Sequence, residues 1–238
     1  MRLFLNGGGS DTQIVSALKR MNRVIVHDKP LLYIPLAMDE REHSYDDCYD
    51  WICSQLVNIS IPRVDMVRTF EELVLKDLND YCAIFIGGGN TYKLLKGLKD
   101  SNSFKKIYDY VMNDGIVFGG SAGSVIFGKD IDIISSMDLN DVDLKDTTGF
   151  NILNDVSIFP HYMNKKSKLT DYVNEELYSR YTKSIVDFSK LIGPVIAYPE
   201  EDTLFIDGNN IEMIGNRDYY YIDNGNIYKN ILFNNDKN

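Results

Sequence analysis

The pattern of apolar and polar residues alternates short apolar runs with amphipathic stretches. Apolar runs at 3–5, 31–36, 64–67, 83–86 and 116–118 predict strands. Between them, residues 44–57, 71–78, 91–98 and 104–112 carry apolar side chains at helical spacing and predict helices. This β-α-β-α order predicts an α/β fold with a mostly parallel sheet wrapped by helices.

The pattern changes after about residue 200. The segment 203–214 predicts two strands joined by the turn Gly208-Asn209, and residues 218–222 and 226–228 flank a second turn, Asp223-Asn224-Gly225. We interpret both hairpins as an antiparallel C-terminal extension of one domain that covers residues 1–238.

Composition narrows the possible functions. The net charge of −10 argues against a nucleic-acid or anionic-membrane surface, because phosphate binding needs clustered Lys and Arg. The apolar run at the start is too short for a signal peptide, and no stretch is long enough to span a membrane. Cys48, Cys53 and Cys82 have no metal-ligand spacing and are typical of reduced thiols, so we expect a cytoplasmic protein.

The clearest chemical motif is Gly119-Gly120-Ser121-Ala122-Gly123, which follows an apolar strand. It fits the G-x-S-x-G nucleophile elbow, where the serine sits on a tight turn and needs small neighbours. The helix that begins at the turn directs its N-terminal amides at the serine, which favours a developing oxyanion. The alternative is a glycine-rich turn with a structural serine.

A nucleophilic serine needs a base, and the chain has three histidines. His27 and His43 precede the serine in polar surroundings and are typical of surface residues. His161 follows a short strand and Pro160, which places it at the carboxyl end of a strand, where open α/β sheets carry their sites. We therefore expect His161 to be the base of Ser121.

Two parts of the site stay open at this level. The group that orients the imidazole could be any acid of the segment between serine and histidine. These acids are Asp130, Asp132, Asp138, Asp141, Asp143, Asp146 and Asp155. The turn Gly87-Gly88-Gly89-Asn90 either supplies further oxyanion donors or is a plain turn in which Asn90 caps the next helix. Gly7-Gly8-Gly9-Ser10 lacks the dinucleotide-binding spacing.

The order of the G-G-G-N turn, the G-x-S-A-G elbow and Pro160-His161-Tyr162 resembles peptidase family S51, which includes dipeptidase E and cyanophycinase. The resemblance covers most of the chain. It implies a class I glutamine-amidotransferase-like α/β fold, with Ser121 as nucleophile, His161 as base and Asp138 as the nearest match for the third residue. Asp141 remains open because, relative to dipeptidase E, the segment carries a small insertion, and Gly89, Asn90 and Ala122 match the oxyanion hole of the family.

One segment departs from the family. Dipeptidase E carries Gly-Glu-Thr-Arg soon after the histidine, a segment associated with recognition of an N-terminal aspartate. The corresponding stretch here has Lys165, Lys166 and Lys168, and the next arginine is Arg180. Since an arginine fork pairs a desolvated carboxylate better than lysines do, we expect no strict preference for aspartyl peptides.

These observations predict a serine peptidase, an exopeptidase or dipeptidase, that cleaves small peptides without a cofactor or metal. The expected partner is a peptide substrate, with no nucleic acid and no membrane, and a homodimer is kept open. Two alternatives remain: an amide or ester hydrolase that uses the same three residues, and a catalytically silent binding protein of the same fold.

Overall fold

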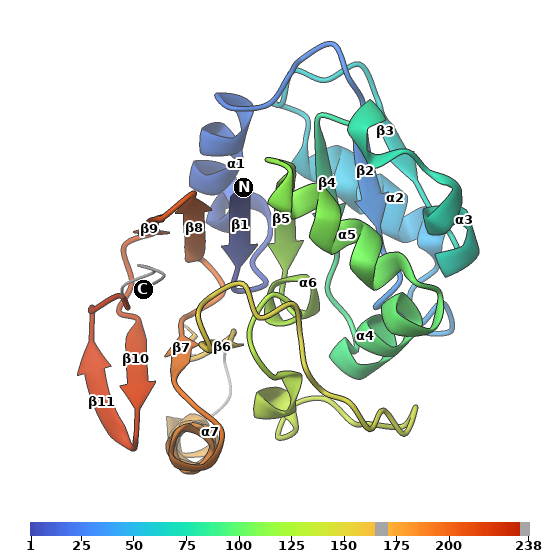
Figure 1. Ribbon diagram of the computed structural model, residues 1–238. Helices are drawn as coiled ribbons and strands as arrows, with labels where there is room; N and C mark the ends of the chain where they lie inside the picture. Colours follow the sequence, from blue (N-terminus) through green and yellow to red (C-terminus); the bar gives the residue numbers. More distant parts are fainter. Residues whose placement is uncertain (165–170, 234–238) are drawn as a thin grey trace.

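A seven-stranded sheet forms the centre of the molecule (Figure 1). The computed structural model describes residues 1–164 and 171–233. The strands of this sheet, in spatial order, are β3 (Val64–Met66), β2 (Leu31–Ile34), β4 (Ala83–Ile86), β5 (Ile116–Gly120), β1 (Arg2–Asn6), β8 (Thr203–Asp207) and β9 (Asn210–Ile214). The first five run parallel, β8 pairs antiparallel with β1, and β9 pairs antiparallel with β8. The prediction of a mostly parallel sheet is therefore confirmed.

Helices cover both faces of this sheet. The α-helices are α1 (Val15–Asn22), α2 (Tyr45–Gln55), α3 (Phe70–Leu75), α4 (Thr91–Asp100), α5 (Ser103–Met112), α6 (Ala122–Val125) and α7 (Asp171–Leu191). Short 3-10 turns lie at η1 (Asp11–Gln13), η2 (Leu78–Asp80) and η3 (Ile131–Ile134). Polar caps mark where helices begin: the Ser44 hydroxyl accepts from the Asp47 N–H, and the Asn90 side chain accepts from the Lys93 N–H. Among the described residues, no helix combines the length and apolar character of a membrane span.

The central strands are apolar on both faces because two cores enclose them. Ile84 and Ile86 pack into the core that α4 and α5 cover, whereas Phe85 points into the core that α1 and α2 cover. Successive side chains of a strand alternate between faces, so a strand buried on both sides needs an unbroken apolar run. Residues 83–86 show that run in the sequence.

A second sheet of four strands lies at the C-terminal side of the molecule (Figure 1). Its strands, in order, are β11 (Asn226–Lys229), β10 (Tyr220–Asp223), β7 (Val195–Ala197) and β6 (Ser157–Phe159). The two predicted hairpins are therefore present but do not form one extension. The hairpin β8–β9 lengthens the central sheet, whereas β10–β11 pairs with β7, which runs parallel to β6.

Asp202 and Ser136 carry the buried side-chain oxygens without a hydrogen-bond partner in the described structure, and of the two only Asp202 can carry a charge. Asp202 lies just before β8, with no exposed surface, and neither of its oxygens has a hydrogen-bond partner among the described residues. Its neighbour Gly215 leaves no room for a side chain, since a β-carbon there would lie 1.9 Å from Asp202 Oδ1. Burial raises the pKa of Asp202 to about 6, because a charged carboxylate loses its hydration there.

Asp202→Asn should therefore stabilise the fold near neutral pH. Between about pH 4 and 6 the folded state keeps the proton of Asp202 while the unfolded state loses it, so this group destabilises the fold as pH rises. We expect the variant to gain about 1–3 kcal/mol in free energy of unfolding at pH 7.5 and little at pH 4. Urea unfolding at both pH values measures this, with the exposed Asp223→Asn as control. An equal effect at both pH values would contradict the titration of Asp202.

Candidate active site

Ser121 occupies a strained turn between β5 and α6. Its backbone φ of 51° and ψ of −112° are unusual for a residue other than glycine. The turn is possible because its neighbours are small. A β-carbon at Gly119 would lie 2.2 Å from the Gly123 carbonyl oxygen, and one at Gly123 would lie 2.2 Å from that of Ile86. The elbow predicted from the sequence is therefore present, with Ser121 half-exposed at its tip.

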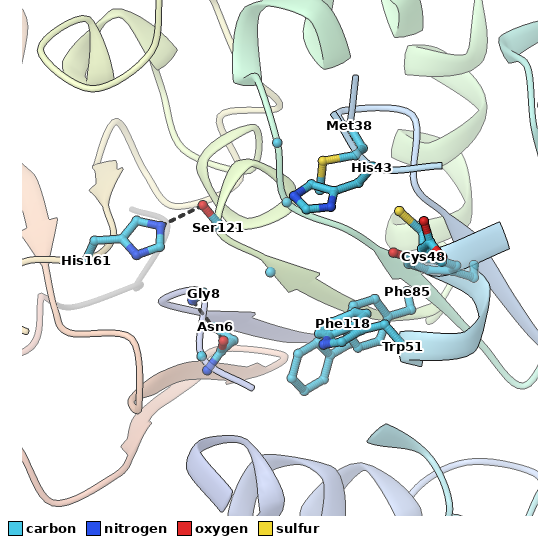
Figure 2. A pocket seen from close by; sticks show the side chains of 16 residues that line it. Asn6, Gly8, Met38, His43, Cys48, Trp51, Phe85, Phe118, Ser121 and His161 are labelled. Atoms are coloured by element: carbon cyan, nitrogen blue, oxygen red, sulfur yellow. Dashed lines mark hydrogen bonds between the residues drawn. The ribbon is translucent and has the colours of Figure 1, made fainter. Parts of the chain in front are cut away.

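His161 lies within hydrogen-bond distance of Ser121. Its Nε2 is 2.8 Å from Ser121 Oγ (Figure 2). His161 follows β6 and Pro160, and it too has a left-handed backbone, with φ of 59°. The imidazole packs against the backbone of Gly8, where a β-carbon would lie 2.3 Å from His161 Cε1. The predicted pair of Ser121 and His161 is thus brought together, and the glycine turn after β1 makes room for it.

The other nitrogen of the imidazole contacts Glu200, an acid that the sequence analysis did not consider. His161 Nδ1 is 2.9 Å from Glu200 Oε1, and both side chains are half-buried. The hydrogen bond from His161 lowers the pKa of Glu200. Glu200 lies beyond β7, after the histidine in the sequence, so the search between Ser121 and His161 was too narrow. The sequence feature that could have pointed to Glu200 is the short strand Val195–Ala197, which is followed directly by Tyr198-Pro199-Glu200.

Asp138, the residue that the resemblance favoured for this position, makes a different contact. Its Oδ2 accepts the N–H of Thr91 at 2.8 Å, at the start of α4. Asp141 is exposed. The expected contact of Asp138 or Asp141 with the imidazole is therefore not present, and the carboxylate that contacts His161 Nδ1 in the structure is that of Glu200. Asp138 is nevertheless close to the site, because it lines a cavity of about 160 Å³ together with Ser121 and His161.

Buried Asn6 connects the three parts of this arrangement. Its carbonyl oxygen accepts the N–H of Ser121 at 3.1 Å and the hydroxyl of Ser124 at 2.7 Å. Its side-chain amide donates to the carbonyl of Glu200 at 3.2 Å and to that of Asp202 at 3.1 Å. Its side-chain oxygen accepts the N–H of Gly8 at 2.9 Å. One residue at the end of β1 thus holds the serine turn, the glutamate loop and the glycine turn.

The backbone amides around Ser121 differ in whether they are free to donate. Asn90 N–H donates to the carbonyl of Ala37 at 2.9 Å, so the expectation that this amide belongs to an oxyanion hole is wrong. Its side chain instead caps α4, which was the alternative interpretation. In the described part of the chain, the amides of Gly88, Gly89 and Ala122 have no hydrogen-bond partner. The Gly88 amide is a further candidate donor for the oxyanion, because Gly88 lies beside the serine: a β-carbon there would lie 3.3 Å from Ser121 Cβ.

A pocket of about 420 Å³ opens beside Ser121 (Figure 2). One end is formed by Ser121, His161 and the glycine turns after β1 and β4. The other end is lined by side chains of β2, β4, β5 and α2, among them Phe118 and Trp51. A ligand that binds in this pocket would therefore have part of its structure at Ser121 Oγ.

The remaining candidates lie away from the serine or outside the described structure. His27 is exposed, and its Nδ1 is 2.8 Å from the Ser60 carbonyl oxygen. His43 is exposed as expected, although it also lines the pocket of about 420 Å³ beside Ser121. Arg180 is exposed on α7. Lys165, Lys166 and Lys168 lie outside the described residues.

Features that would indicate a metal site or disulfides are not found in residues 1–164 and 171–233. No group of three or more His, Cys, Asp or Glu side chains is placed to bind a metal ion there. All three cysteines are free thiols, and two of them are buried. Burial raises the pKa of the Cys82 thiol to about 11, so it remains protonated near neutral pH.

Comparisons with known proteins agree with this geometry. The model of peptidase family S51 matches residues 3–214. A peptidase E from Shewanella denitrificans is 27% identical over 89% of this chain and 86% of its own length. A peptidase E from Pasteurella multocida is 26% identical over 80% of this chain and 76% of its own length. The crystal structure of a peptidase from an acI-B1 Actinobacterium matches the fold with a TM-score of 0.68 at 18% identity, over 96% of this chain and 93% of its own. The chain therefore belongs to peptidase family S51 and is a serine-type peptidase.

Proposed function

We propose that this peptidase hydrolyses small peptides through an acyl-enzyme formed on Ser121. The proposal rests on two hydrogen-bond contacts of one imidazole. His161 Nε2 lies 2.8 Å from Ser121 Oγ, and His161 Nδ1 lies 2.9 Å from Glu200 Oε1. A nucleophile, a base and an orienting carboxylate in this order are the arrangement that serine hydrolases use.

The proposed steps follow from these positions. Ser121 Oγ attacks the peptide carbonyl carbon while His161 Nε2 takes its proton, and the carbonyl oxygen becomes an oxyanion. The oxyanion then collapses, the C–N bond breaks, and His161 delivers the proton to the leaving amine. Water, deprotonated by His161, releases the acyl group in the same way. Glu200 holds the imidazole with Nδ1 protonated and stabilises the imidazolium that forms.

The oxyanion needs hydrogen-bond donors that are already in place. The amides of Gly89 and Ala122, together with that of Gly88, serve this role in the proposal, because in the described structure no other group accepts from them. Ala122 lies at the first position of α6, whose short axis adds little dipole, so the individual N–H groups supply the stabilisation.

We further propose that the enzyme is an exopeptidase that acts on a free N-terminal residue, as in a dipeptidase. Asp138 lines the small cavity with Ser121 and His161 and uses one carboxylate oxygen on the Thr91 N–H. A half-buried carboxylate beside the nucleophile offers a partner for a substrate ammonium group. Since Ser121 lines this cavity, the ammonium and the reacting carbonyl can belong to the same residue.

The comparisons favour peptide substrates over the two other functions considered, because the relatives named above are peptidases. A cytoplasmic location stays a prediction that fractionation of the host cell would test, and it is consistent with the free thiols. A homodimer stays a prediction that sedimentation equilibrium would test.

Ser121→Ala should abolish peptide hydrolysis while the fold is kept. The rate should fall on the order of 10⁴-fold or more, because serine and base act as a unit. Hydrolysis of a dipeptide panel and labelling by a fluorophosphonate probe measure the loss, and circular dichroism checks the fold. The exposed Ser135→Ala is the matched control and should behave as the parent enzyme. Turnover by a folded Ser121→Ala protein would overturn the mechanism.

Glu200→Gln should lower kcat on the order of 10²–10⁴-fold, because an amide neither stabilises the imidazolium nor reliably selects the required tautomer. Glu201→Gln is the adjacent control, since Glu201 pairs with Arg217 rather than with His161. The measurement is kcat and KM for one good substrate at several pH values. A full loss in Glu201→Gln and none in Glu200→Gln would reject Glu200 as the orienting residue.

Asp138→Asn should raise KM about 10- to 100-fold for peptides with a free amine, with a smaller effect on labelling of Ser121 by the fluorophosphonate probe. The probe has no ammonium group, so it reports the nucleophile alone. An N-acetylated peptide should be a poor substrate of the parent enzyme and should lose little more in the variant. Equal losses for free and acetylated peptides would show that Asp138 does not read the amine.

A further inference from the structure

The large pocket beside Ser121 indicates which side chain the substrate carries. We infer that it binds an apolar or aromatic side chain on the residue that is transferred to Ser121, so that the preferred substrates are peptides with an N-terminal Phe, Leu or Met. This inference rests on the proposed function, since it names the substrate class of the same site.

The far end of the pocket is built from aromatic and other apolar groups. Its walls are Tyr33, Met38, Cys48, Trp51, Phe85 and Phe118. The rings of Phe85 and Phe118 stack with centroids 4.7 Å apart, and Trp51 meets Phe85 edge to face at 6.1 Å. Phe85 and Phe118 are 1% exposed and belong to the core, so this end of the pocket has a rigid floor. A wall of this kind gains most from an apolar or aromatic ligand.

The position of His161 decides which part of the peptide enters the pocket. His161 lies on one side of Ser121, and Met38 and Trp51 lie on the other (Figure 2). The leaving amine must face His161 to receive the proton, so it departs on the histidine side. The side chain of the acyl residue therefore extends to the opposite side of Ser121, where it meets the apolar end of the pocket.

Charge on the pocket disfavours an acidic side chain. Asp47 lines the pocket and is exposed at its rim, and the described lining residues include no Lys or Arg. A substrate carboxylate would lose hydration against the aromatic walls and would meet a like charge at Asp47. A neutral side chain avoids both costs. The volume of about 420 Å³ lies within the range of small-ligand pockets and leaves room for an aromatic ring.

The first experiment compares four dipeptides that share one C-terminal residue and begin with Phe, Leu, Asp or Lys. We expect kcat/KM for the Phe and Leu peptides to exceed that for the Asp peptide by about 100-fold or more. Competition of each peptide against fluorophosphonate labelling of Ser121 provides a second ranking. The two rankings should agree, and the second one does not depend on turnover.

Two sets of variants test the pocket itself. Trp51→Ala removes an aromatic wall and should lower kcat/KM for the Phe peptide about 10- to 100-fold, more than for an Ala peptide, while Trp51→Phe should retain most activity.

Asp47→Asn removes the negative charge at the rim and should raise the ratio of kcat/KM for the Asp peptide to that for the Leu peptide about 3- to 10-fold. Asp50→Asn removes the same charge from α2 at an exposed position outside the pocket lining and should leave that ratio unchanged. Ratios within one variant cancel differences in active protein.

The outcomes separate this inference from the proposed function. If Ser121 reacts with the probe and the Asp or Lys peptide ranks first, or all four rank equally, the pocket assignment is overturned and the mechanism stands. If Ser121 does not react and no peptide is cleaved, the proposed function fails and the inference with it. A preference for Phe or Leu that Trp51→Ala leaves intact would also overturn the assignment.

Discussion

The geometry of the site depends on the hydrogen bonds of Asn6. A serine, a histidine and a glutamate that lie 39 and 40 residues apart in the chain must meet within 3 Å. Asn6 is fully buried and uses its carbonyl, its side-chain amide and its side-chain oxygen, each on a different segment. Since an unsatisfied buried amide is costly, this network selects one arrangement of the three segments. Tyr198 adds a second link, because its hydroxyl donates to the Leu5 carbonyl at 2.9 Å.

Backbone strain at the reacting pair follows from the same packing. Ser121 and His161 both have positive φ, a conformation that side chains other than glycine adopt rarely. The surrounding contacts leave little alternative: the Ser121 N–H is held by Asn6, and the His161 ring packs against Gly8. Strain that the fold imposes keeps the hydroxyl and the imidazole aligned before a substrate arrives. The glycines near the site therefore act by permitting close approach, which explains why three separate glycine turns converge on it.

The sequence predicted the parts of this site that depend on local pattern. The elbow around Ser121 needs small residues at fixed spacing, and His161 follows a strand end, so both could be found along the chain. Glu200 could not be chosen in this way, because its contact with His161 depends on how β6 and β7 pair in a second sheet. The amide of Asn90 was misassigned for a related reason: its partner, Ala37, belongs to a loop after β2 that no local pattern connects to it. Pairing between distant strands is a property of the whole fold rather than of a short segment.

Ser121 lies at the boundary of two cavities with different chemistry. One holds the carboxylate of Asp138, and the other is walled by aromatic rings with Asp47 at its rim. The described residues of both cavities carry no lysine or arginine, and the chain has a net charge of −10. Such a site attracts an ammonium group and repels a carboxylate. The substrate that fits both cavities at once carries its positive charge at the N-terminal amine and a neutral, apolar side chain on the same residue. Asp138 then selects the charged amine and the aromatic pocket selects the apolar side chain. Both groups are attached to the same carbon atom, next to the carbonyl that Ser121 attacks.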